Sequence, residues 1–199
     1  MHDFISAENL KQWLRHAHTC EPESSGIDIT ADLTPAAVLV PLVMRDSGIT
    51  VLLTQRTAHL HNHAGQVSFP GGRVDPEDID HVATALREAE EEVGLVAAQI
   101  EVVASLPRFC TGTGFRIDPV VGLVTPPLNL KLDDFEVADV FEVPLNFLMD
   151  EANWRHESVE VGGKRRHFWA MPWRDRYIWG ATAGMIVSFK HCLNQGRQS

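Results

Sequence analysis

The sequence predicts an α/β (α+β) fold in which helices flank both faces of a mixed β-sheet. Short apolar stretches typical of strands recur along most of the chain. A few helical stretches are interspersed among them, as in sheets covered by helices. At 199 residues, 44% of them hydrophobic, the chain is long enough to bury a substantial core. We therefore expect a single domain spanning residues 1–199.

The N-terminal segment has the spacing of an amphipathic helix over residues 6–18. Leu10, Trp13 and Leu14 follow one another at i, i+3 and i+4 and form its apolar side. Ser6 is suited to the N-cap position. We expect this helix, within residues 1–20, to pack on the rest of the domain.

The next segments predict strands, turns and two further helices. Residues 37–44 and 49–55 flank the turn Asp46-Ser47-Gly48 and predict a β-hairpin, whose first strand is apolar throughout and therefore buried. Residues 67–69 lead into a glycine turn. Other expected elements are strands at 100–106, 116–124 and 138–143, a short helix from Pro144, a hairpin of 158–161 and 165–170 around Gly162-Gly163, and a closing helix at 181–194.

An acidic helix between residues 80 and 94 carries the main chemical signal. Gly94 is suited to the left-handed C-cap that ends a helix. At about 100° per residue, Glu88, Glu91 and Glu92 share one face that is about 100° wide. Arg87 lies one turn before Glu91, where an ion pair can orient that carboxylate. The apolar stripe beside this face consists of Val82, Ala85, Leu86, Ala89 and Val93.

Three carboxylates on one helix face repel one another unless a cation offsets their charge. Hard divalent ions such as Mg²⁺ bind carboxylate oxygens together with phosphate oxygens and water. A solvated acidic surface is the alternative interpretation of such a run. The glycine pair of Phe69-Pro70-Gly71-Gly72, just upstream, favours the metal site because glycines allow a backbone to approach phosphate closely.

The stretch from Gly71 to Leu95 resembles the Nudix box, G-x5-E-x7-R-E-U-x-E-E-x-G-U, in which U is a bulky apolar residue. The matches to its second half are Arg87, Glu88, Glu91, Glu92, Gly94 and Leu95, with the smaller Ala89 at the first U. One residue more than the box allows separates Gly72 from Arg87, so the expected glutamate falls near Asp78, whose role stays open. The resemblance implies the Nudix α/β/α sandwich.

Residues 52–72, LLTQRTAHLHNHAGQVSFPGG, resemble the signature of coenzyme A pyrophosphatases within this family, LLTxR-[SA]-x3-R-x3-G-x3-FPGG. The matches are Leu52, Leu53, Thr54, Arg56, Gly65, Phe69, Pro70, Gly71 and Gly72. Thr57 stands where Ser or Ala is expected, and His61 stands where Arg is expected. The second departure matters more, because Arg binds phosphate bidentately at any pH whereas His is only partly charged near neutrality.

These resemblances imply an enzyme that splits coenzyme A, or a derivative, into 3',5'-ADP and 4'-phosphopantetheine. Glu88, Glu91 and Glu92 would hold Mg²⁺ or Mn²⁺, with the Gly72 carbonyl as a further ligand, and Arg87 would orient Glu91. Glu136 is our candidate for the general base, although it is equally consistent with an ordinary acidic loop residue. The expected substrate-binding residues are Arg56, His61, Gly65, Phe69 and Gly71.

Three other functions remain as alternatives. The first is a Nudix hydrolase of ADP-ribose, NADH or a dinucleoside polyphosphate. The second is a non-catalytic Nudix module that senses a nucleotide, which a damaged box or an attached DNA-binding domain would favour. The third is an isopentenyl diphosphate isomerase, which shares the fold, but the segments that carry its Cys and Glu acid/base pair are not found.

Charge and composition favour a small molecule as the binding partner of this chain. A net charge of -10 argues against nucleic acid bound through a basic face, and the longest apolar run, 36–44, is too short to cross a bilayer. The N-terminus lacks the features of a signal peptide. Three cysteines, Cys20, Cys110 and Cys192, predict no disulfide framework or zinc site. We expect a cytoplasmic protein with reduced thiols, and a homodimer remains open.

Overall fold

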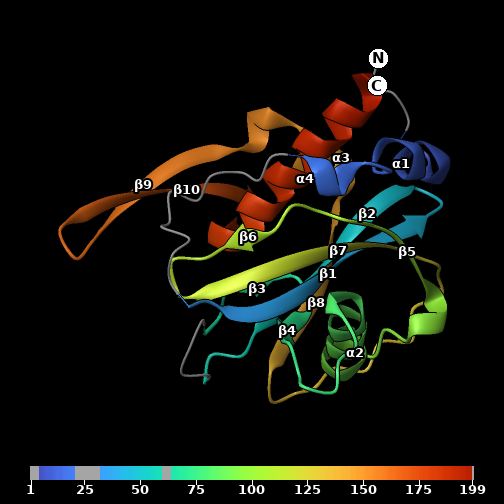
Figure 1. The fold of residues 1–199 in the computed structure, drawn as a ribbon, viewed down its shortest axis with the longest axis horizontal. Helices are drawn as coiled ribbons and strands as arrows, with labels where there is room; N and C mark the ends of the chain where they lie inside the picture. Colours follow the sequence, from blue (N-terminus) through green and yellow to red (C-terminus); the bar gives the residue numbers. More distant parts are fainter. Residues whose placement is uncertain (1–4, 21–31, 60–63, 199) are drawn as a thin grey trace.

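The computed structural model describes residues 5–20, 32–59 and 64–198. Within these residues, an eight-stranded mixed sheet lies between helices on its two faces (Figure 1). The sheet is built in the order β3-β2-β1-β7-β5, while β4 pairs with β1, β6 with β7 and β8 with β2. The predicted α/β/α arrangement is therefore confirmed.

The strands of this sheet are β1 (Thr34–Arg45), β2 (Gly48–Arg56), β3 (Val67–Ser68), β4 (Gly71–Arg73), β5 (Ile100–Ser105), β6 (Phe109–Cys110), β7 (Phe115–Val124) and β8 (Val137–Pro144). The helices are α1 (Ala7–Trp13), α2 (His81–Val93), α3 (Leu145–Met149) and α4 (Gly180–Gln198), with 3₁₀ turns η1 (Ala17–Thr19), η2 (Ala97–Gln99) and η3 (Glu151–Asn153). Most predicted elements are present, and their ends shift by a few residues.

Strand β1 lies at the centre and separates two hydrophobic cores. It pairs antiparallel with β2, as the predicted hairpin requires, and parallel with β7, which makes the sheet mixed. Its residues alternate between the two faces because successive side chains of a strand point in opposite directions. Leu39 packs into the core under α2, whereas Val40 packs into the larger core under α1 and α4. Residues 36–43 of this strand are buried, as predicted for most of it, whereas Met44 is half-buried.

The N-terminal helix is shorter than expected but begins as predicted. The Ser6 hydroxyl accepts a hydrogen bond from the Asn9 N–H at 3.1 Å. The α-helix ends at Trp13, and a 3₁₀ turn over Ala17–Thr19 replaces its last turn. Leu10 and Leu14 are buried in the larger core, where α1 packs against α4.

The predicted hairpin around Gly162-Gly163 forms, but in a separate sheet. Strand β10 (Lys164–Trp173) pairs with β9 (Arg155–Val161) on one side and with β11 (Arg176–Trp179), which was not predicted, on the other, in a three-stranded sheet. The β9–β10 hairpin extends away from the main sheet in Figure 1. Among the described residues, no helix combines the length and apolar character needed to cross a membrane.

Candidate active site

Local sequence signals fix both ends of α2. The Asp80 carboxylate accepts a hydrogen bond from the Ala83 N–H at 2.8 Å, so Asp80 is the N-cap. Gly94 adopts the predicted left-handed conformation with φ 73°. A Cβ at Gly94 would lie 2.8 Å from the Lys131 nitrogen, so the position also needs glycine for space. Ala85, Ala89 and Val93 are buried.

The two glycines before α2 form a short strand, β4, where the sequence suggested a turn. This strand pairs antiparallel with β1. A Cβ at Gly71 would lie 2.4 Å from the Ala37 carbonyl oxygen, and one at Gly72 would lie 2.5 Å from Glu88 Oε1. The absence of side chains therefore lets the backbone touch the central strand on one side and a carboxylate of α2 on the other.

Glu92 is a buried carboxylate, only 5% exposed. Its Oε2 accepts a hydrogen bond from the Gly71 N–H at 3.1 Å, and its Oε1 lies 3.6 Å from Arg56 Nη1. Burial raises the pKa of Glu92 to about 8, although the Gly71 N–H and Arg56 oppose the shift. Ionised Glu92 is therefore costly unless a further positive charge lies beside it.

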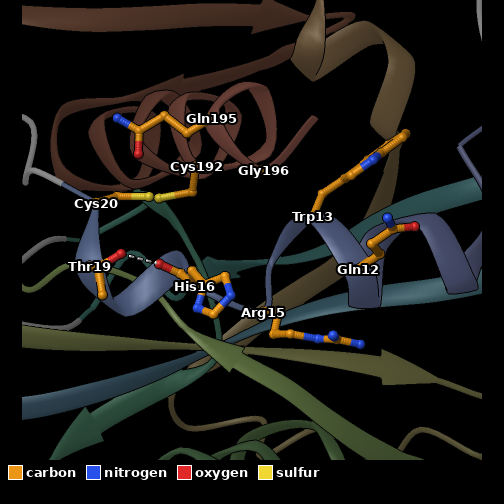
Figure 2. A pocket seen from close by; sticks show the side chains of 9 residues that line it. All are labelled: Gln12, Trp13, Arg15, His16, Thr19, Cys20, Cys192, Gln195 and Gly196. Atoms are coloured by element: carbon orange, nitrogen blue, oxygen red, sulfur yellow. Dashed lines mark hydrogen bonds between the residues drawn. The ribbon is translucent and has the colours of Figure 1, made fainter. Parts of the chain in front are cut away.

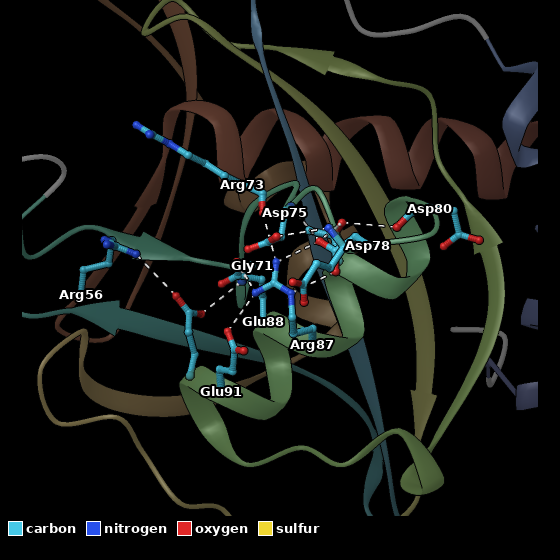
Figure 3. A network of polar contacts seen from close by, with 12 residues as sticks. Arg56, Gly71, Arg73, Asp75, Asp78, Asp80, Arg87, Glu88 and Glu91 are labelled. Carbon is cyan, nitrogen blue, oxygen red and sulfur yellow. Dashed lines mark hydrogen bonds and ion pairs between the residues drawn. The ribbon is translucent and has the colours of Figure 1, made fainter.

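Arg87 holds the acidic residues of this region together (Figure 3). Its Nη1 contacts Glu88 Oε1 at 3.0 Å and Glu91 Oε2 at 2.9 Å, so the predicted pairing one turn apart is present. Its Nη2 donates to the Arg73 carbonyl at 3.2 Å. One guanidinium thus links the helix face to the end of β4.

Asp78 is the main anchor of Arg87, which sequence spacing alone left open. Arg87 Nε and Nη2 donate to the two Asp78 oxygens at 3.1 and 3.0 Å, in a bidentate pair. The Thr84 hydroxyl donates to the same carboxylate at 2.8 Å. The Arg87 guanidinium holds the pKa of Asp78 far below its usual value. Despite the extra residue, Asp78 therefore occupies the place opposite Arg87.

A loop before β8 brings Glu136 to the same site. The Lys131 and Asp133 N–H groups donate to the last carbonyls of α2, those of Val93 and Glu92, at 3.1 and 3.0 Å. Glu136 Oε2 lies 3.4 Å from Arg56 Nη2. Burial is the main cause that raises the pKa of both Glu88 and Glu92, and the negative charge of Glu136 adds to it, so the three carboxylates lie within electrostatic reach of one another.

Thr57 fixes the other end of this loop. Its backbone N–H donates to the Glu136 carbonyl at 3.0 Å, and its hydroxyl donates to the Phe135 carbonyl at 2.8 Å. Thr57 is 7% exposed, so these bonds are largely shielded from water. Sequence comparison suggested only a mild departure at this position, whereas the structure gives its hydroxyl a definite contact beside Glu136.

The sequence pattern of the NUDIX domain family matches residues 33–161. This range contains β4, α2 and the Glu136 loop. The chain belongs to the Nudix family.

Two relatives illustrate the relationship. One is an uncharacterised Nudix hydrolase NudL of Citrobacter koseri, 39% identical over 181 residues, which are 91% of this chain and 93% of the relative. The other is the NudL of Escherichia coli K12, 42% identical over 151 residues, 76% of this chain and 78% of the relative. The predicted superfamily and enzyme class, a Nudix hydrolase of phosphoric anhydrides, are thereby confirmed.

A solved structure supports the fold. The crystal structure of a MutT/nudix family protein from Enterococcus faecalis superposes with a TM-score of 0.51, covering 94% of this chain and 73% of that protein at 17% identity. At this identity the likeness concerns the fold alone. The Nudix α/β/α sandwich predicted from the sequence therefore has a counterpart among solved structures.

The Nudix carboxylates suit a divalent cation in chemistry, but they are not gathered around one point. Among the described residues, no group of three or more His, Cys, Asp or Glu side chains converges as a preformed metal site. Arg87 forms ion pairs with Glu88 and Glu91, while Arg56 lies beside Glu92. Burial raises the pKa of Glu88 as well as that of Glu92. Two desolvated carboxylates beside a glycine backbone form a donor set that fits Mg²⁺ or Mn²⁺.

The remaining predicted site residues lie in different surroundings. Gly65 is exposed, with φ 69°, and its carbonyl accepts a hydrogen bond from Gln55. Phe69 is 2% exposed in the larger core, so its side chain supports the glycine strand from within. His61 lies outside the described residues. Neighbouring His59 is exposed and packs against Phe135, with ring centroids 5.0 Å apart.

Proposed function

We propose that this Nudix hydrolase cleaves the diphosphate of coenzyme A, or of a coenzyme A derivative, to 3',5'-ADP and 4'-phosphopantetheine. The observation that carries the proposal is the signature over residues 52–72. Its Arg56 lies against Glu92 and Glu136, and its two final glycines border Glu88 and Glu92. The signature that suggests the substrate is thus continuous with the residues suited to the chemistry.

In this proposal, Mg²⁺ or Mn²⁺ is held by Glu88, Glu91 and Glu92, with the Gly72 carbonyl as a further ligand. When bound, the ion neutralises charge on the diphosphate oxygens and lowers the pKa of the attacking water. Glu91 is the most exposed of the three, with a side chain 60% accessible, so it can turn away from Arg87 at little cost. Arg87 remains fixed by Asp78 and keeps Glu88 in place.

Glu136 is the proposed general base. Its side chain is 42% exposed, so water reaches the carboxylate, and the loop bonds to Thr57 and α2 hold it beside Glu88 and Glu92. The water oxygen forms a bond to phosphorus while Glu136 accepts the water proton. The bond from phosphorus to the bridging oxygen then breaks, and the leaving phosphate keeps that electron pair.

Arg56 is the proposed diphosphate contact. Its side chain is 24% exposed, and its contacts with Glu92 and Glu136 are long, at 3.6 and 3.4 Å. A phosphate group can therefore replace one carboxylate as its partner and form a shorter bidentate pair. Gly65, Phe69 and Gly71 shape the backbone around it, and His61 is proposed to contact the same substrate. We also infer a cytoplasmic location and leave a homodimer to measurement.

The test is turnover of coenzyme A, ADP-ribose, NADH and diadenosine tetraphosphate, each with Mg²⁺ or Mn²⁺, with products identified by mass. We expect metal-dependent release of 3',5'-ADP from coenzyme A, well above the rates with the other three. Faster turnover of another substrate would overturn the coenzyme A assignment and make His61 the first residue to change, by His61→Arg. Absence of turnover throughout would favour a nucleotide-sensing module.

A further inference from the structure

Two cysteines that lie far apart in sequence meet on the sheet face opposite α2. Cys20 follows η1, and Cys192 lies in α4; both are buried, at 8% and 1% exposure. The Ala17 carbonyl accepts hydrogen bonds from the Cys20 N–H at 3.1 Å and from Cys192 Sγ at 3.7 Å. Figure 2 shows the two sulfur atoms facing each other, and the Cys192 thiol hydrogen-bonds the Cys20 side chain.

The thiol pair forms part of the wall of a cavity of about 260 Å³ between α1, η1 and α4. Trp13, Arg15 and His16 line it on one side and Gln195 on the other (Figure 2). A small reagent can therefore reach the sulfur atoms even though little of their surface is exposed. Arg15 and His16 also give the cavity basic side chains, which are typical surroundings of reactive cysteines.

We propose that Cys20 and Cys192 are a reversible oxidation site, at which a hydroperoxide converts the two thiols into a disulfide that joins η1 to α4. The site is independent of the diphosphatase proposal. It also differs from the sequence expectation, which found no pairing because the three cysteines are odd in number and widely spaced. Their adjacency arises only from the packing of α1 and η1 against α4.

The reaction balances with the hydroperoxide as the sole oxidant. Cys20, the more exposed residue of the two, loses its proton and attacks the terminal peroxide oxygen through its thiolate. The O–O bond breaks, the attacked oxygen stays on Cys20 as a sulfenic acid, and the other oxygen takes up the released proton and leaves as water or an alcohol. Cys192 sulfur then attacks Cys20 sulfur, the S–O bond breaks, and the oxygen departs as water with the Cys192 proton. Two thiols thus supply the two electrons that reduce one hydroperoxide.

The surroundings assign different roles to the two residues. Burial is the main cause that raises the pKa of Cys192, and the hydrogen bond to Cys20 adds to it. Cys192 is therefore the poorer nucleophile toward the peroxide, and it retains the proton that the departing water takes in the second step. The disulfide would close a long loop of chain and stabilise the fold. Because α2 lies on the other face of the sheet, we expect hydrolysis to be unchanged by the cross-link (Figure 1).

The experiment treats the full chain with hydrogen peroxide, blocks remaining thiols, and maps peptides without reduction. We expect two of the three thiols to be lost, a Cys20–Cys192 peptide, a raised Tm, and full recovery after a dithiol reductant. Cys110→Ser should still form the disulfide, whereas Cys20→Ser should not. The Cys110 thiol, on β6, serves as the internal comparison in the wild-type chain should a variant fold poorly.

Three results would overturn the proposal. One is retention of all three thiols in the peroxide-treated wild type, measured after unfolding. Another is oxidation of Cys110 ahead of the pair, and the third is a disulfide between two chains instead of within one.

Discussion

The two faces of the main sheet bury different kinds of side chain. Under α2, the core consists of small and aliphatic residues. The charged network of Arg87, Asp78, Glu88 and Glu91 lies on and beside the same helix. Under α4, the core contains more buried hydrophobic residues, and it includes the thiol pair. Burying a charge destabilises a fold, whereas burying apolar area stabilises it. The α2 face therefore carries the proposed chemistry, and the α4 face carries more of the stability.

The strongest test of this difference between the two faces is a change of charge on the α2 face. Glu92→Gln should lower kcat about 100-fold or more, the range found when a group that stabilises charge is removed. The Tm should hold or rise, because the amide can still accept the Gly71 N–H. Gln also avoids the free energy that the fold loses near pH 7 by burying a group that is ionised in the unfolded chain and whose pKa burial raises to about 8.

The matched control for that change is Glu90→Gln. Glu90 lies on the same helix but is exposed, so it should keep near-normal kcat. Steady-state kinetics and thermal melts of both variants decide the matter. Near-normal turnover of the Glu92 variant would disprove the metal assignment.

The converse experiment acts on the α4 face. Leu10→Ala removes a fully buried side chain that packs α1 against the larger core, and should cost about 2–5 kcal/mol of unfolding free energy. The kcat of the folded fraction should not change, because Leu10 touches nothing on the α2 face. Gln12→Ala, on the exposed side of the same helix, is the control, and urea titration gives both free energies. Loss of kcat in folded Leu10→Ala would mean that the faces are coupled.

A finer test concerns how the Glu136 loop is held. Thr57→Val keeps the side-chain shape but removes the hydroxyl that donates to the Phe135 carbonyl. Loss of one buried hydrogen bond is worth about 1 kcal/mol, so we expect kcat to fall up to about tenfold through displacement of Glu136. Thr57→Ser should restore the rate. If Val and Ser variants have equal kcat, the hydroxyl does not position the loop.

Much of α2 was predictable because its signals are local. Asp80 and Gly94 cap the helix, and the spacing of Ala85 and Ala89 sets its buried face. The β4 strand was not predictable, since a glycine pair is typical of turns and only the distant β1 makes it a strand. The predicted N-terminal helix was longer than α1 for a similar reason. The 3₁₀ turn that follows α1 packs against α4, which the local sequence does not show.

The site residues divide in the same way. The pairing of Arg87 with Glu91 follows from helical spacing, whereas its pairing with Asp78 joins two segments whose register the extra residue obscured. The attachment of the Glu136 loop to the end of α2 depends on backbone carbonyls, which no sequence pattern marks. Contacts made through the backbone and across the chain therefore had to come from the structure.

The smallest effect that we predict concerns an ion pair between strands β1 and β8 of the main sheet. Glu142 accepts hydrogen bonds from Arg45 Nε at 3.1 Å and from the Thr50 hydroxyl, and Arg45 holds the pKa of Glu142 below its usual value. A lowered carboxylate pKa contributes stability above the unfolded-state pKa of about 4.3, and this contribution is lost as the pH falls through the folded-state pKa. Because the pair is partly exposed, it is worth about 1 kcal/mol at most.

Glu142→Gln should therefore be slightly less stable than wild type at pH 7, and the two free energies of unfolding should converge in acid. Urea titrations across that pH range measure both. A constant difference at every pH would assign the effect to packing instead of charge.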